Sequence, residues 1–152
     1  ILGRLIRVMG KIHSSVSVVA PPLDGAAPWF RGDEADLEEM AGNLLDNACK
    51  WSGGRVIVTI ESERGPGGAL VLIGIDDDGP GLGEKDAEKV LRRGVRLDEK
   101  TPGSGLGLDI VKELVDVYGG SLLLKRSALG GLRAELRLPA ARGGSTAKPP
   151  SA

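Results

Sequence analysis

The sequence predicts one α/β domain, in which helices and strands share a single core. The chain has 152 residues, of which 41% are hydrophobic, so it is long enough to bury a sizeable core in one domain. Segments with helical periodicity are interspersed with short alternating segments that are typical of strands. The 24 glycines cluster in the loops between these segments, which favours ligand-holding loops over a disordered chain.

Charge and cysteine content narrow the possible functions. The 20 basic side chains are balanced by 21 acidic ones, so we expect no nucleic-acid partner. Cys49 is the single cysteine, which excludes an internal disulfide and is typical of a reducing compartment. No apolar run reaches the roughly 18 residues of a membrane span, and no signal peptide is visible. Because residue 1 is Ile, we expect a fragment of a longer protein.

The N-terminal part is predicted to contain a helix and two short strands. Residues 1–12 have a 3-4-3 apolar spacing, which is typical of a heptad seam whose partner helix lies elsewhere; the alternative is an amphipathic helix that packs on its own domain. Residues 15–19 (SVSVV) alternate as a strand that Pro21 ends, and Trp29–Phe30 are expected to form a short strand. The seam consists of Leu2, Leu5, Met9 and Ile12.

A long helix and a hairpin are predicted for the middle of the chain. Asp33 is a suitable N-cap for a helix over residues 34–51. Residues 55–62 and 69–76 have the alternation of strands, and the GPGG between them is typical of a hairpin turn.

The C-terminal part is predicted to contain two more helices, a hairpin and a tail. The second of these helices ends at Gly119–Gly120. Residues 140–152 are small and polar, so we predict a disordered tail. The elements before the tail are helices at 84–91 and 105–118 and strands at 121–127 and 132–138.

The predicted helix over residues 34–51 has a broad apolar face and a narrow polar stripe. At ~100° per residue, the stripe carries Asn43, Asn47 and Lys50. Each mid-helix Asn costs ~0.5 kcal/mol relative to Ala. A solvated face is the simplest explanation, but amide oxygens are also hard ligands suited to phosphate-bound Mg²⁺. A lysine one turn further along supplies a point charge for phosphates.

Two glycine-containing stretches follow. DDDGPGL (76–82) places three acids at the end of an apolar strand, directly before a glycine turn. GSGLGL (103–108) opens into a helix N-terminus, where backbone N–H groups can bind an anion. The second loop is no Walker A loop, because no Lys-Ser/Thr pair follows its glycines, and no strand directly precedes it as in a Rossmann fingerprint.

Together, NLLDNACKW (43–51), DDGPGL (77–82) and GSGLGL (103–108) resemble the N, G1 and G2 boxes of the GHKL ATP-binding superfamily. This superfamily includes gyrase-type ATPases, Hsp90 chaperones, MutL and sensor histidine kinases. The resemblance covers residues 15–139 and implies a Bergerat fold, a mixed sheet with about three helices on one face and a mobile lid over the nucleotide. Residues 1–14 would then be the end of an upstream dimerisation helix with its linker.

The resemblance also implies roles in binding ATP. Asp77 would accept a hydrogen bond from the adenine amine, while Gly79 and Gly81 let the backbone close around the base. Solvation alone is an alternative for Asp76 and Asp78. The remaining nucleotide contacts would be Trp51, for which core packing is the alternative, and Leu82, Gly103, Ser104, Gly105, Leu106, Gly107 and Leu108.

Metal and phosphate would be held by the polar stripe and the lid. Asn47, with Asn43, would be the ligands of Mg²⁺. The lid is expected over residues 92–104, and its Arg96 would contact the phosphates together with Lys50. The usual phenylalanine before the lid is missing, since Val90-Leu91-Arg92 stands there. Asn43, Lys50 and Arg96 are the expected catalytic residues.

Within the superfamily, the helix favours a kinase. Members that hydrolyse ATP carry a Glu general base where this chain has Asn43, and an amide cannot take a proton from water at neutral pH. The stretches resemble PhoQ-type sensor kinases, in which the γ-phosphate passes to a histidine of a separate dimerisation domain. His13 lacks the neighbours of such an acceptor and is expected to be a linker residue. A protein-serine kinase of the anti-sigma type and a nucleotide-binding module without kinase activity are the alternatives.

The same resemblance implies partners and a location. The expected partners are the upstream dimerisation domain and a response regulator. The full-length protein would be a homodimer anchored in the inner membrane, with this domain in the cytoplasm.

Overall fold

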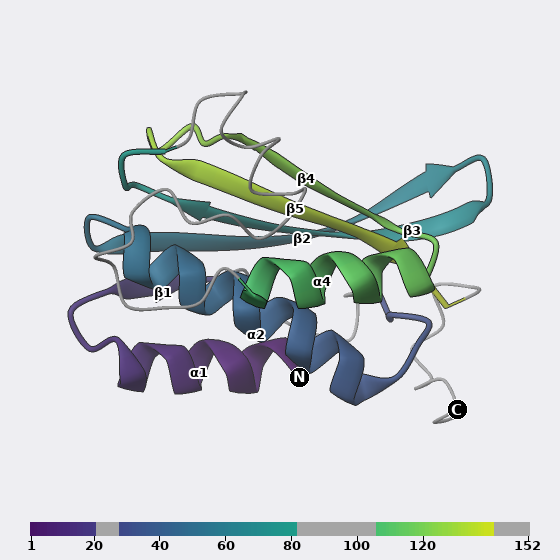
Figure 1. The fold of residues 1–152 in the computed structure, drawn as a ribbon, viewed down its shortest axis with the longest axis horizontal. Helices are drawn as coiled ribbons and strands as arrows, with labels where there is room; N and C mark the ends of the chain where they lie inside the picture. The colour runs from purple at the N-terminus through teal and green to yellow at the C-terminus, as the bar shows by residue number, and fades with distance from the viewer. Residues whose placement is uncertain (21–27, 82–105, 142–152) are drawn as a thin grey trace.

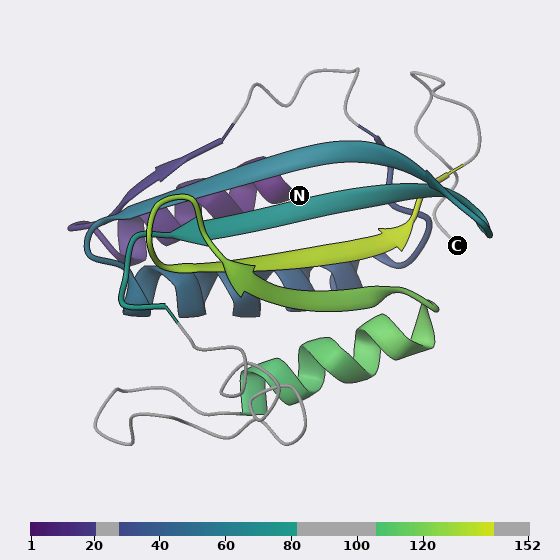
Figure 2. The same cartoon turned by 90° about the horizontal axis from the view of Figure 1, so that it is seen from above.

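A five-stranded mixed sheet forms one layer of the protein, and helices form the other (Figure 1). The computed structural model describes residues 1–20, 28–81 and 106–141. In this part of the chain three helices lie side by side on one face of the sheet, while the opposite face, called the outer face below, carries none (Figure 2). The predicted fold class is confirmed.

The elements follow the predicted order. The sheet has the strand order β1-β2-β3-β5-β4, in which only the β1–β2 pair is parallel. The predicted helix 84–91 and the lid fall outside the described residues. The elements are α1 (Leu2–Ile12), β1 (Ser17–Val19), α2 (Glu34–Trp51), β2 (Arg55–Gly65), β3 (Gly68–Asp77), α4 (Leu106–Val117), β4 (Ser121–Arg126) and β5 (Leu132–Pro139).

Most differences from the predicted bounds concern strand ends. β1 begins at Ser17 instead of residue 15. The β2–β3 hairpin is longer than predicted, because the ladder continues to the Gly65–Gly68 pair on both sides of a two-residue turn. Gly68 has φ +123°, a conformation that favours glycine, so the glycines of this turn close the hairpin.

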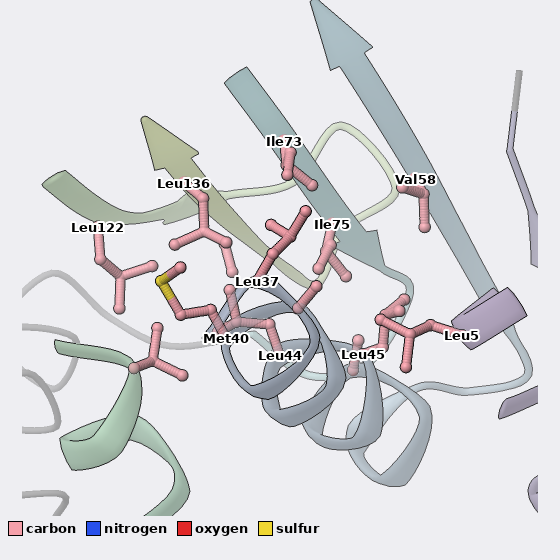
Figure 3. Close-up of a cluster of buried hydrophobic side chains, with 14 of the residues drawn as sticks. Leu5, Leu37, Met40, Leu44, Leu45, Val58, Ile73, Ile75, Leu122 and Leu136 are labelled. Atoms are coloured by element: carbon pink, nitrogen blue, oxygen red, sulfur yellow. The ribbon is translucent and has the colours of Figure 1, made fainter. Parts of the chain in front are cut away.

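The core lies between α2 and the sheet. Leu37, Met40, Leu44 and Leu45 of α2 are buried and point toward the strands (Figure 3). Opposite them, the apolar side chains that are buried beneath the sheet include Val58, Ile73, Ile75, Leu122 and Leu136 (Figure 3). The predicted apolar face of this helix is therefore confirmed, and α2 packs on the sheet through it.

Helix α1 packs on its own domain as an amphipathic helix. This was the alternative to a heptad seam with a partner helix elsewhere. Leu5 is 7% exposed within the core, and Leu2 and Met9 pack against it. Ile12 does not share this face, because it is 63% exposed. Arg4 of α1 also pairs with Glu38 of α2 at 3.1 Å.

The segment before α2 and the end of the chain meet at β3 and β5. Phe30 forms an isolated antiparallel bridge with Ala140, so the predicted short strand is reduced to one bridge. Ala140 N donates to Ala69 O, and Ala141 N to Trp29 O, so these two residues of the predicted tail belong to the ordered domain. None of the described helices is long and apolar enough to cross a membrane.

Candidate functional site

The three consecutive acids at the end of β3 occupy three different environments. Side chains alternate along a strand, so Asp77 lies on the helix side with Ile73 and Ile75, while Asp76 lies on the outer face. Asp78 follows at the turn. Each of these carboxylates has its own set of donors, described in turn below.

Asp77 is buried and accepts hydrogen bonds on one oxygen. Its Oδ1 accepts from Gly79 N at 2.9 Å and from Leu132 N at 3.2 Å, and the residue is 2% exposed. Among the described residues, none donates to Oδ2. Burial raises the pKa of Asp77 above its usual value, although the two N–H donors work against this rise. A buried carboxylate with one oxygen committed presents its other oxygen as an acceptor for a ligand N–H.

Asp78 connects the acidic turn to the segment between α2 and β2. Its Oδ1 accepts from Gly53 N at 2.8 Å and from Arg55 N at 3.1 Å. The N–H of Arg55, followed by that of Gly53, lowers the pKa of Asp78. The carboxylate thereby fixes the acidic turn at the C-terminal end of α2.

Asp76 is an ion-paired residue of the outer face. Its Oδ2 lies 2.6 Å from Arg133 Nη1, and its Oδ1 accepts from Ser127 Oγ at 2.8 Å. Asp76 is 9% exposed. Solvation alone, the alternative considered for Asp76 and Asp78, therefore describes neither of them: protein donors hold the Asp76 carboxylate inside the fold and the Asp78 carboxylate at the surface.

Glycines allow the segments around Asp77 to approach closely. A Cβ on Gly79 would overlap with the carbonyl oxygen of Trp51, so this turn can pack on the end of α2 only with glycine here. A Cβ on Gly131 would overlap with Asp77 itself. Gly81 has φ +74°, in the left-handed region. The acidic turn therefore contacts both the end of α2 and the β4–β5 turn.

The polar stripe of α2 leads toward this turn. Asn43 and Asn47 are half-buried, and Asn47 lies one helical turn before Trp51, about 6 Å along the axis. Asn43 Nδ2 donates to Glu39 O at 2.7 Å, so the amide oxygen is the atom that Asn43 can offer to a ligand.

Lys50 is engaged with a neighbour on the same helix. Lys50 Nζ lies 2.7 Å from Asp46 Oδ2, and Asp46 Oδ1 is 2.9 Å from His13 Nε2. Partial burial works to raise the pKa of Asp46, but the bonds from Lys50 and His13 outweigh it, so the pKa is lowered. The sequence pattern did not predict that Asp46 would bridge the lysine and the histidine.

Of the other predicted site residues, the structure describes one fully, two by their backbone alone and the rest not at all. Leu108 is half-buried in α4 and packs against the core. The structure describes the backbone of Leu106 and Gly107 as the start of α4. The predicted residues that are not described are Leu82, Arg96, Gly103, Ser104 and Gly105.

Three residues at the β4–β5 turn and the start of β5 were missed as candidate site residues. Ser127, Gly131 and Leu132 contact the acids of β3. The sequence predicted only a hairpin turn here. The sequence did contain a signal. Gly130 has φ +100°, which explains one glycine at the turn, but the turn does not need the second, Gly131, for its own conformation. A second glycine indicates close contact with another segment.

Comparison with known proteins places these features in a family. Residues 32–142 match the family described as histidine kinase-, DNA gyrase B-, and HSP90-like ATPase. The chain is 43% identical over 143 residues to the sensor protein kinase CarS of Pseudomonas aeruginosa, covering 94% of this chain and 30% of that protein. It is 36% identical over 141 residues to the sensor protein PhoQ of Escherichia coli, covering 90% of this chain and 27% of PhoQ.

A solved structure has the same fold. The ATP-binding domain of PrrB from Mycobacterium tuberculosis superposes with a TM-score of 0.72 and 30% identity, over 91% of this chain and 90% of that one. The chain thus spans about a third or less of the curated relatives but nearly all of this isolated domain.

Proposed function

The chain belongs to the histidine kinase-, DNA gyrase B-, and HSP90-like ATPase family, and we propose that it is the catalytic, ATP-binding domain of a sensor histidine kinase. One observation carries this proposal. The end of the Asn-bearing helix α2 packs on the turn that holds the buried acceptor Asp77. An adenine amine can donate to Asp77, and the polar stripe then lies where the phosphates would extend.

A histidine acceptor fits the amide at position 43 of α2, where a hydrolytic member of the superfamily would carry a carboxylate base. Water must lose a proton to become a good nucleophile, and Asn43 cannot take that proton. A neutral imidazole already has a lone pair on nitrogen. That nitrogen bonds to the γ-phosphorus, the bond from phosphorus to the β–γ bridging oxygen breaks, and ADP leaves with the electron pair. The domain then has only to bind, orient and stabilise charge.

The side chains of the stripe fit Mg²⁺. The amide oxygens of Asn47 and Asn43 are hard, neutral ligands of the kind that Mg²⁺ accepts alongside phosphate oxygens. Asn43 uses its nitrogen on Glu39 O at 2.7 Å, which leaves its oxygen for this role. When bound, the ion would neutralise phosphate charge. Lys50, and Arg96 outside the described residues, would bind the phosphates directly.

The rest of the kinase follows from the same proposal. The acceptor histidine would lie on a dimerisation domain of the full-length protein, and a response regulator would receive the phosphoryl group. Homology to sensor kinases supports a homodimer anchored in the inner membrane, with this domain on the cytoplasmic side.

Phosphotransfer in two separate reactions tests the proposal. Incubated alone with γ-labelled ATP, the chain should remain unlabelled. With a dimerisation domain that carries the acceptor histidine added, an acid-labile phosphohistidine should appear on that domain. Acid-stable label on a serine would instead indicate a serine kinase, and ATP binding without label in either reaction would indicate a nucleotide-binding module without kinase activity. Label on the isolated chain that disappears in His13→Ala would contradict the proposal.

A further inference from the structure

The outer face of the sheet carries a cluster of charged side chains next to the acidic turn. Arg133 bonds Asp76 at 2.6 Å and Glu135 at 3.1 Å, and Glu135 also accepts from Arg137 at 3.0 Å. Arg133 crosses over Gly74, where any Cβ would overlap with the guanidinium. Both oxygens of Asp76 are therefore used, one by Arg133 and the other by Ser127.

Ser127 organises the turn between β4 and β5. Its hydroxyl donates to Asp76 Oδ1 at 2.8 Å and accepts from Leu129 N at 3.0 Å. Its backbone N–H donates to Gly131 O at 2.8 Å, and its carbonyl accepts from Gly130 N at 3.0 Å. Ser127 is 5% exposed, so these bonds are sheltered from water. One residue thus anchors the turn to β3 and also closes it.

The turn anchored in this way contacts Asp77 from the other side of the strand. Gly131 lies directly against the Asp77 carboxylate, and Leu132 N donates to its Oδ1 at 3.2 Å. Figure 2 shows the β4–β5 turn beside the end of β3. Leu132 N shares Oδ1 with Gly79 N, so the position of the turn is one of two contacts that fix how the Asp77 carboxylate is rotated.

We propose that Ser127 is a positioning residue for adenine recognition, which acts from the outer face by holding the β4–β5 turn against Asp77. The inference rests on the proposed function, in which Asp77 accepts from the adenine amine. A rotated carboxylate would no longer direct Oδ2 at that amine, whereas the phosphate contacts on α2 would be unaffected. Ser127 therefore influences the choice of base and leaves phosphate binding alone.

The test measures three affinities for the wild type and for Ser127→Ala, using Mg-ATP, Mg-GTP and Mg-tripolyphosphate. The ratio of ATP to GTP affinity should fall about threefold to tenfold, the equivalent of one hydrogen bond. Tripolyphosphate affinity should stay unchanged. Hydrogen exchange at the Leu132 amide should become faster in the variant, with or without nucleotide. If Ser127→Ala does not fold, Ser127→Cys keeps the side-chain volume with a weak donor and should change the ratio in the same direction.

Matched controls separate positioning from stability. Glu135→Gln weakens the ion pairs on the same face but leaves every bond of Ser127, so it should lower the unfolding temperature without changing the ATP-to-GTP ratio. Ser62→Ala, at an exposed serine of β2, should change neither. A wild-type ratio in Ser127→Ala, or an equal loss of tripolyphosphate affinity, overturns the inference alone. A wild type that binds ATP and GTP equally overturns both the base-reading role of Asp77 and this inference.

Discussion

Lys50 Nζ lies 2.7 Å from Asp46 Oδ2, one turn earlier on the same helix. Both side chains are about a third exposed, so the pair is neither free nor fully buried. His13, at the end of α1, holds the other oxygen of Asp46 at 2.9 Å. The cation proposed to bind phosphate is thus partly neutralised before ATP arrives, and ATP must compete with Asp46 for it.

Asp46→Asn should strengthen Mg-ATP binding by about twofold to fivefold, the range of a partly exposed ion pair. The charge of Lys50 would then be available to the phosphates without competition. Titration calorimetry at two salt concentrations measures this effect, which should shrink at high salt. Glu61→Gln makes the same charge change at an exposed site of β2 and is the control. A gain of the same size in Glu61→Gln would assign the effect to net charge.

Asp77→Asn should stabilise the fold while it weakens adenine recognition. The pKa of Asp77 is raised in the folded state, so its ionised form costs stability at neutral pH, and this cost disappears as the pH falls through the folded pKa. Asn keeps an oxygen for Gly79 N and Leu132 N. The unfolding temperature of the variant should exceed that of the wild type at pH 8, with a difference that vanishes toward acid pH.

The same variant should lose affinity for ATP by about 10- to 150-fold, the value of a hydrogen bond to a charged group. GTP affinity should change much less. If ATP affinity is retained in Asp77→Asn, Asp77 does not recognise the base.

Asn43→Glu should give the isolated chain a slow ATP hydrolysis. A carboxylate at this position can take a proton from water, and general bases contribute about 10²- to 10⁴-fold. We expect phosphate release to rise at least about tenfold because the carboxylate would lie on the stripe that we propose to bind the phosphates. Asn43→Gln keeps the amide and should show no rise. Equal rates for the two variants would mean that residue 43 is not beside the attacking water.

Gly79→Ala should destabilise the protein by about 1–3 kcal/mol, the cost of overpacking, because its Cβ would overlap with the Trp51 carbonyl. Gly67→Ala is the control, since nothing lies within 4 Å of a Cβ there. Denaturant unfolding compares the two. If both variants unfold at the same denaturant concentration, the acidic turn does not pack closely on the end of α2.

The sequence predicted those parts of the fold that depend on neighbouring residues. The bounds of α2 were predicted correctly, because both signals are local: the apolar periodicity and the N-cap, where Asp33 Oδ1 accepts from Ala35 N at 2.7 Å. The hairpin was predicted too short, because residues 63–65 are mostly exposed and lack alternation. Their strand conformation comes from the ladder and the two-residue turn.

The candidate site was proposed from motifs, and its long-range contacts were not predicted. Asp77 was proposed from its glycine-flanked motif, but its contact with Leu132 spans 55 residues, and that of Asp76 with Ser127 spans 51. Local patterns do not encode such pairs. Lys50 was expected to contact phosphate, but in the structure it is paired with Asp46. The helical pattern places both residues on neighbouring positions and does not specify which rotamer the lysine side chain adopts.

The shortness of β1 makes the N-terminal segment a weak mechanical link. Only three ladder positions join it to β2, whereas β2 and β3 share ten. A load applied at residue 1 is borne by those three positions and by the packing of α1 on α2. Residues 1–20 should therefore peel away at low force while the four antiparallel strands stay paired. A pull on the N-terminus would also draw His13 from Asp46 and alter the charge next to Lys50.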